Sequence, residues 1–131
     1  MALLLAARCN RVEIVELLLS IPESFAGQRL DVNLQNEEGF TALIIASFCG
    51  NTEVVKLLLS RHDLNVNLQD ENGWTALIWA SLHGRVEIVE LLLSRPEINV
   101  NLRRFTCRLT ALMIASLRGC TEIVSLLENH K

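Results

Sequence analysis

The sequence predicts an all-α solenoid, in which antiparallel helix pairs stack side by side and β-hairpin-like loops project between the pairs. Three observations predict this fold. A nine-residue apolar segment recurs along the chain, a Thr-Ala-Leu motif recurs before it, and a turn-rich segment separates successive copies. A period of this length is the signature of repeat architectures, whose units bury their apolar faces against one another.

The apolar segment at residues 12–20 (VEIVELLLS) returns unchanged at residues 86–94. A close variant occupies residues 52–60 (TEVVKLLLS), and a more divergent copy occupies residues 121–128 (TEIVSLLE). Thr41, Thr75 and Thr110 each open a Thr-Ala-Leu motif, and they are 34 and 35 positions apart (41 to 75 to 110). Met-Ala-Leu at residues 1–3 takes the same place in the first copy.

Each unit should form two short helices. In the third unit they cover residues 76–82 and 86–93, with Gly84 between them. Helices this short are unstable alone and need packed neighbours. The segment 65–74 alternates polar with apolar residues and ends in Asp70-x-x-Gly73, a pattern typical of a hairpin-like turn. One domain, residues 1–131, is predicted, with repeats at about 1–33, 34–67, 68–101 and 102–131 and a lengthened loop at 21–30, which holds Pro22 and Gly27.

Residues 73–93 (GWTALIWASLHGRVEIVELLL) resemble the ankyrin repeat, whose pattern is G-x-T-P-L-H-x-A-A-x-x-G-H-x-E-I-V-x-L-L-L followed by Val-Asn across the loop. The resemblance extends over essentially the whole chain in four copies. Tetratricopeptide repeats have a similar period, but they lack the hairpin and require W-x-x-L-G-x-x-Y, which this chain does not contain. The resemblance implies an ankyrin solenoid that acts as a protein–protein interaction module.

The chain departs from the ankyrin pattern in two columns. Alanine, the best helix former, replaces the family proline at Ala42, Ala76 and Ala111. Apolar side chains replace the family histidine, so we expect the repeats to depend more on packing and less on that histidine's hydrogen bonds; these are Leu4, Ile44, Ile78 and Met113.

The fourth hairpin and the two ends are also irregular. Arg108 stands in the glycine position of the fourth hairpin, where a positive φ is costly, so a different loop shape is expected. The chain closes on a polar segment, 128–131, but opens on Leu3, Leu4 and Leu5 with no hairpin before them. Either another element covers that apolar end, or the chain is part of a longer array, which the pattern favours.

Composition argues against several classes of function. The net charge of −3 and the pI of about 5.6 give no electrostatic footprint for nucleic acid and no polybasic membrane site. No apolar run is long enough to span a bilayer. Four cysteines contain no C-x-x-C pair, and Arg8 interrupts the apolar start, so we expect no secretory signal. An intracellular, by default cytoplasmic, location is expected; nucleus and host cell remain open.

No catalysis, metal or cofactor is expected. Cys9, Cys49, His83 and Arg118 occupy one position in successive repeats. Equivalent residues on packed helices are about 8–10 Å apart, whereas zinc ligands lie about 2.0–2.3 Å from the metal. The acidic pairs 37–38 and 70–71 are interpreted as solvated turn residues at hairpin tips.

The resemblance implies that a partner binds to the hairpin tips and the concave face of the first helices. Carried over position by position, the partner-binding residues are Glu37, Glu38, Phe40, Phe48, Cys49, Glu71, Asn72, Trp74, Trp79, Leu82, His83, Leu117 and Arg118, with Thr106, Cys107 and Leu109 less regular. Trp74 and Phe40 are expected to be exposed. Trp79 and Phe48 are either groove aromatics or packing residues.

Charge adds an expectation about the partner. Acidic tips at Glu37, Glu38 and Glu71 favour a basic segment, and the arginines at 103, 104, 108 and 118 favour a nearby acidic one. The leading function is an adaptor or scaffold. The alternatives are a structural module that self-associates through its apolar N-terminal end, and the targeting region of a larger enzyme.

Overall fold

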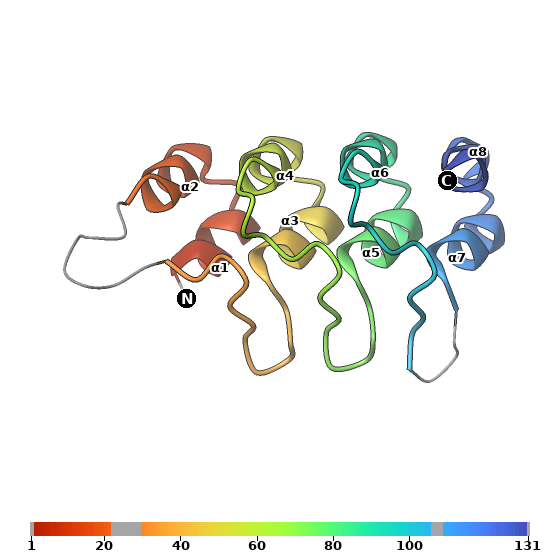
Figure 1. Cartoon of the computed structure of the whole chain (residues 1–131), viewed down its shortest axis with the longest axis horizontal. Coiled ribbons are helices and arrows are strands. Elements are labelled where there is room, and N and C mark those ends of the chain that lie inside the picture. Colours follow the sequence, from red (N-terminus) through yellow and green to blue (C-terminus); the bar gives the residue numbers. More distant parts are fainter. Residues whose placement is uncertain (1, 22–29, 106–108, 131) are drawn as a thin grey trace.

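The computed structural model describes residues 2–21, 30–105 and 109–130, and these residues form eight helices and no strand. The helices make four antiparallel pairs, arranged as a row (Figure 1). The all-α prediction is therefore confirmed. The pairs are α1 (Ala2–Arg8) with α2 (Val12–Leu19), α3 (Ala42–Cys49) with α4 (Thr52–Leu59), α5 (Ala76–Leu82) with α6 (Val86–Leu93), and α7 (Ala111–Arg118) with α8 (Thr121–Asn129). Most of the predicted long loop, residues 22–29, and Arg108 lie outside the described residues.

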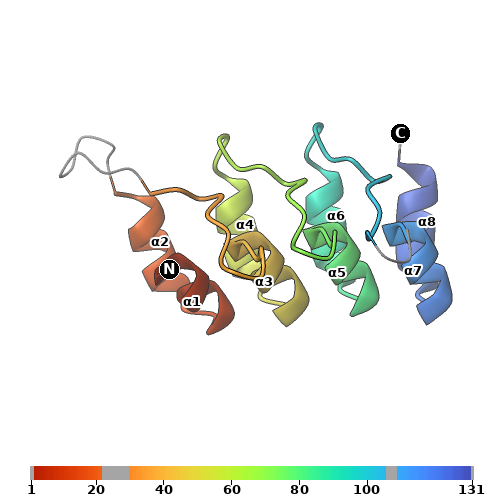
Figure 2. The ribbon, with the colours of Figure 1, turned by 90° about the horizontal axis from the view of Figure 1, so that it is seen from below.

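The helices form two layers. The first helices, α1, α3, α5 and α7, each contact the next one along the row, and the second helices, α2, α4, α6 and α8, do the same. Loops extend to one side of the first-helix layer, and the view from that side shows the pairs stacked in register (Figure 2). This arrangement buries one continuous core between and along the two layers.

The Thr-Ala-Leu motif marks the start of a helix because its threonine is the N-cap. The side-chain oxygens of Thr41 and Thr75 accept the backbone N–H groups of Ile44 and Ile78, both at 3.1 Å. Thr110 caps α7 in the same way, at 3.3 Å. A threonine cap satisfies one of the backbone donors left free in the first turn of a helix.

The apolar column that replaces the family histidine lies mostly in the core. Leu4, Ile44 and Ile78 are at most 4% exposed, whereas Met113 is 44% exposed. The equivalent residue of each earlier pair is covered by the pair that follows it. Among the described residues, no further pair follows α7 and α8.

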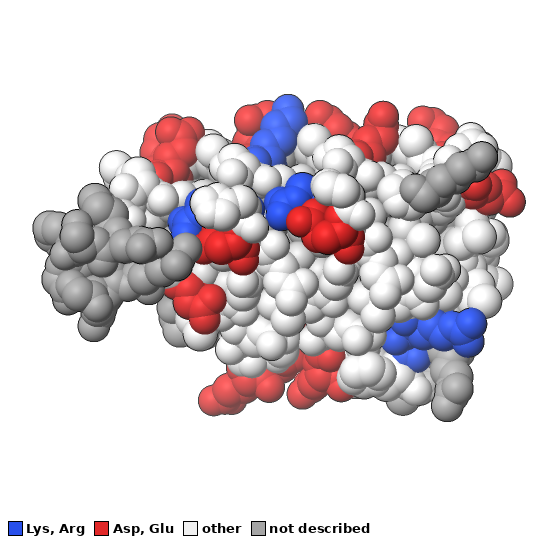
Figure 3. Space-filling view, in the orientation of Figure 1, with Lys and Arg blue, Asp and Glu red and all other residues white. Residues whose placement is uncertain are grey.

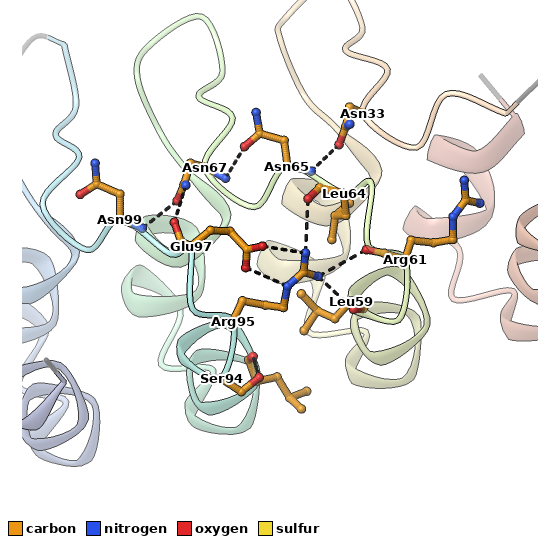
Figure 4. A network of polar contacts seen from close by, with 11 residues as sticks. Asn33, Leu59, Arg61, Leu64, Asn65, Asn67, Ser94, Arg95, Glu97 and Asn99 are labelled. Atoms are coloured by element: carbon orange, nitrogen blue, oxygen red, sulfur yellow. Dashed lines mark hydrogen bonds and ion pairs between the residues drawn. The ribbon is translucent and has the colours of Figure 1, made fainter.

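A polar ladder also joins successive loops (Figure 4). The side chain of Asn33 accepts the backbone N–H of Asn65 at 2.7 Å and donates to the carbonyl of Asp63. One repeat later, Asn67 accepts the N–H of Asn99 at 2.8 Å and donates to the carbonyl of Glu97. Hydrogen bonds between the loops therefore supplement the packing between repeats. The apolar residues at the family histidine position do not predict these bonds.

Two arginines extend this ladder to the helices. The guanidinium of Arg95 donates to the carbonyl of Leu59 at 2.9 Å and pairs with Glu97. Arg61 makes the equivalent contact with the carbonyl of Leu19 at 3.4 Å. Each arginine thus satisfies a carbonyl at the C-terminal end of the preceding second helix, where the last turn leaves acceptors without helical partners.

Candidate partner-binding surface

The hairpin before each of α3 and α5 is shaped by one side chain. The carboxylate of Asp70 accepts the backbone N–H groups of Asn72 and Trp74 at 3.0 and 2.9 Å. Asn36 does the same in the preceding hairpin, for Glu38 and Phe40. Side chains of this kind stabilise tight turns by replacing a backbone acceptor.

Backbone hydrogen bonds then join one hairpin to the next. The N–H of Glu71 donates to the carbonyl of Glu38 at 3.0 Å, and the N–H of Phe105 donates to that of Asn72 at 2.9 Å. The side chain of Gln69 adds a bond to the carbonyl of Arg103. The hairpin tips are consequently held at fixed positions relative to each other.

Five side chains of the middle two repeats form an aromatic cluster: Phe40, Phe48, Trp74, Trp79 and His83. Trp79 is at its centre, with ring centroids 5.2 Å from Phe48, 6.3 Å from Phe40 and 4.2 Å from Trp74. Phe40 and Phe48 also meet edge to face at 5.7 Å. The rings are close enough to be in contact, and aromatic pairs in contact attract one another beyond the area that they bury. Five of the predicted partner-binding residues are thus brought together.

The predicted exposure of Trp74 is wrong, because this indole is only 9% exposed. One face stacks on Trp79, and the guanidinium of Arg104 lies 4.2 Å from its ring centroid. Arg104 occupies the position that Asp70 holds in the preceding hairpin. The irregular fourth hairpin therefore supplies a cation over the tryptophan instead of an acceptor for its own turn.

Phe40, Phe48 and Trp79 are half-buried, so Phe40 is less exposed than predicted. The indole N–H of Trp79 donates to the second carboxylate oxygen of Asp70 at 3.0 Å, which fixes the orientation of the ring. These three aromatics therefore pack against their neighbours while part of each remains accessible.

The prediction that Asp70 is a solvated turn residue is wrong. Asp70 is 3% exposed, and its carboxylate accepts hydrogen bonds from the backbone of the turn and from the indole of Trp79. The Asp-x-x-Gly pattern predicts the turn contacts. The contact with Trp79 joins residues nine positions apart and depends on how the hairpin folds back over α5, which no local pattern encodes.

His83 forms the exposed edge of the aromatic cluster. Its ring lies parallel to that of Trp79, with centroids 5.9 Å apart. Burial lowers the pKa of His83 below its ordinary value of 6.5, and the positive charges of Arg85 and Arg118 lower it further. The imidazole is thereby held in its neutral form over a wider pH range than a free histidine.

Charged side chains surround this cluster unevenly. The residues at the hairpin tips, Glu37, Glu38, Glu71 and Asn72, are exposed. Figure 3 shows acidic side chains along the edge formed by the hairpins before α3 and α5, and basic side chains at the end near α7. Along the edge formed by the hairpins, the sign of the charge therefore changes toward α7.

The remaining predicted residues are more scattered. Cys49 and Leu82 are half-buried, Arg118 is exposed, and Leu117 is 74% exposed on α7. Phe105, at 60% exposure, was not among the predicted residues, although it takes the position of Glu71 in its hairpin. Thr106 and Cys107 lie outside the described residues.

The described residues contain no group of three or more His, Cys, Asp and Glu side chains placed to hold a metal ion. Cys9, Cys49 and Cys120 are free thiols. Across the same part of the chain, every helix is too short or too polar to traverse a bilayer.

A family model described as ankyrin repeats, in three copies, matches residues 3–104. The comparison with curated proteins gives no match.

Proposed function

This chain belongs to the ankyrin repeat family, and we propose that it is an adaptor or scaffold that binds a partner protein through its hairpin tips and the aromatic cluster. Ankyrin repeats are generally protein–protein interaction modules and typically non-catalytic. The observation that carries the proposal is the aromatic cluster itself. Three of its rings are packed in place and still partly accessible, and its members come from two hairpins and two first helices.

Rigidity supports this proposal. Trp79 is fixed by Trp74, Phe48 and Asp70, so it loses little side-chain freedom when a partner covers it. Preorganised aromatics that can be fully desolvated are the residues most often found at binding hot spots. The bonds between successive hairpins favour a partner that contacts several repeats at once.

Charge indicates the chemistry of this partner. Glu37, Glu38 and Glu71 are exposed beside the aromatic cluster, and the side chains nearest the α7 end are basic. We therefore propose a partner segment with an apolar anchor for the cluster and Lys or Arg residues for the acidic tips. Complementary charge of this kind mainly sets specificity and the rate of encounter.

A selection from a random peptide library displayed on phage tests this proposal. The bait is the full chain, and a triple variant, Glu37→Lys with Glu38→Lys and Glu71→Lys, is used for counter-selection. We expect the selected peptides to combine basic residues with an aromatic or aliphatic anchor. Their affinity should fall with added salt, because exposed charges are screened over about 10 Å at 0.1 M.

A matched control separates local charge from net charge. Glu16, Glu90 and Glu128 are exposed on the second helices, away from the hairpins, and their triple reversal changes the net charge equally. Peptides that bind the control but not the hairpin-tip variant support the proposal. Equal binding to both variants, or enrichment of acidic peptides, contradicts it.

A further inference from the structure

One ten-residue segment occurs twice in the chain but lies in two different environments. Residues 11–20 and residues 85–94 are identical, and they contain α2 and α6. Ile88 of α6 is 1% exposed and Leu91 is half-buried, whereas the equivalent Ile14 and Leu17 of α2 are 47% and 68% exposed. The same apolar face is thus covered in one copy and bare in the other.

The covering of α6 shows what this face binds. It packs against α4, and Arg85, the N-cap of α6, donates to the carbonyl of Phe48 at 3.2 Å. The guanidinium lies over the C-terminal end of α3, because a Cβ built on Gly50 would be 2.8 Å from Arg85 Cζ. An apolar helix face and an arginine at its N-terminus therefore dock together on the preceding repeat.

The α7–α8 end of the molecule offers a surface similar to the one that receives α6. Residues 110–129 are identical to residues 41–60 at 12 of 20 positions. Gly119 ends α7 in the same left-handed conformation as Gly50, with φ of 73° and 79°, but nothing lies within 4 Å of a Cβ built there. Met113 and Leu117 are 44% and 74% exposed, whereas Ile44 is 1% exposed and Phe48 is half-buried.

We propose that the chain binds a second copy of itself head to tail, with α1 and α2 of one copy stacked on α7 and α8 of the next. This contact repeats the one that α5 and α6 make with α3 and α4. Arg11, which occupies the position of Arg85, then lies over Gly119 and donates to the carbonyl of Leu117 of the other copy. This self-association surface is distinct from the proposed partner site, because most of the aromatic cluster stays accessible when two copies stack.

Two of the differences from the internal contact weaken the head-to-tail contact electrostatically. Arg118 replaces Cys49, so it places a second positive charge near Arg11 of the neighbouring copy. Ser125 replaces Lys56, which pairs with Glu87 at 3.8 Å, so the equivalent ion pair is lost. Association is consequently weaker than the internal contact. Substituting Arg118→Ser should strengthen it, because a like-charge repulsion is removed.

The contact surfaces on the two copies differ, so association does not close after one step. Head-to-tail contacts produce open assemblies unless the rotation closes a ring. In sedimentation equilibrium of the full chain, we expect the average mass to keep rising with concentration. A single charge on either face, Leu17→Glu or Met113→Glu, should weaken association about tenfold or more, which is the effect of removing one hot-spot contact.

Mixing the two variants gives the decisive measurement. Leu17→Glu retains an intact α7–α8 face and Met113→Glu retains an intact α1–α2 face, so an equimolar mixture should form a one-to-one dimer and nothing larger. His62→Glu, which adds the same charge at an exposed site after α4, is the control and should assemble like the unmodified chain. Circular dichroism verifies that each variant is folded.

Three results would overturn this proposal: no gain in mass of the unmodified chain at any concentration, a variant mixture that stays monomeric, or dimers formed by Met113→Glu alone. The last result would mean that two α1–α2 ends pair with each other. Because peptide binding to the aromatic cluster is measured separately, failure of self-association leaves the partner-binding proposal standing, and the reverse also holds.

Discussion

Asp70 is the residue on which the middle of the predicted binding surface depends. Its two carboxylate oxygens accept two backbone N–H groups of its own hairpin and the indole N–H of Trp79. A buried carboxylate is stable when hydrogen bonds replace its lost hydration. Asp70 therefore couples the shape of the hairpin to the orientation of the central aromatic ring.

Replacing Asp70 with alanine should destabilise the fold by about 1.5–3 kcal/mol, the usual cost of leaving buried donors without a charged acceptor. The free energy of unfolding in urea measures this loss, and tryptophan fluorescence reports the freed indole. Glu71→Ala removes the neighbouring exposed carboxylate and should change stability by less than about 0.5 kcal/mol. Equal losses in the two variants would contradict the role assigned to Asp70.

His83 should make the stability of the fold depend on pH. Its pKa is lowered by burial and by Arg85 and Arg118, so the unfolded chain takes up this proton more readily than the folded one. The contribution is present above the ordinary pKa of 6.5 and is lost as the pH falls below that value toward the lowered pKa. Chemical unfolding should be measured at about pH 7.5 and about pH 5.5. The free energy of unfolding should fall less between these two pH values for His83→Gln than for the unmodified chain.

Titration by NMR checks this assignment directly. The imidazole resonances of His83 should report a pKa below 6.5, and Arg118→Gln should raise that pKa because one of the nearby positive charges is removed. A pKa at or above 6.5 for His83 in the folded chain would contradict this assignment. It would show that the imidazole is well hydrated and that the solvent screens the charges of both arginines.

At the scale of the elements, short helices are joined by two sets of contacts. Their N-caps and apolar faces follow from local sequence, and for that reason the predicted helices at 76–82 and 86–93 agree with α5 and α6. The asparagine ladder is different, because its bonds join residues 30 or 32 positions apart. A recurring Asn-Val-Asn is visible in the sequence, but its hydrogen-bond partners become evident only once the loops are side by side.

Asn67→Ala should remove two bonds between repeats, one to the N–H of Asn99 and one to the carbonyl of Glu97. We expect a loss of about 1–2 kcal/mol in the free energy of unfolding, since each neutral hydrogen bond contributes about 0.5–1.5 kcal/mol. Hydrogen exchange provides a sharper test. The amide of Asn99 should lose protection, while the amide of Asn65, which is bound by Asn33, should keep it. If both amides lose protection together, the ladder does not act bond by bond.

At the scale of the whole molecule, the sequence predicts the architecture better than the surface. Repeat spacing and apolar periodicity fix the stack, because each repeat contacts only its neighbours and a local pattern therefore determines a global shape. The surface is harder to predict. The burial of Trp74 depends on Arg104 from the next hairpin, and the exposure of Ile14 depends on which face has a neighbour.

The same nearest-neighbour logic predicts how stability is distributed along the stack. A leucine occupies the same position in the second helix of each repeat, and its burial increases with the number of neighbouring repeats. Leu58 and Leu92 are fully buried in the middle, Leu127 is 6% exposed, and Leu18 is half-buried.

Truncation of this leucine to alanine should cost about 2–5 kcal/mol at the two central positions, since a buried cavity is left behind. At Leu18 it should cost at most about 2 kcal/mol, because the exposed part of the side chain contributes little. Unfolding of the four variants in urea, at a concentration low enough to keep the chain monomeric, measures the series. Equal costs at all four positions would contradict this distribution, because the half-buried Leu18 would then contribute as much as a fully buried leucine.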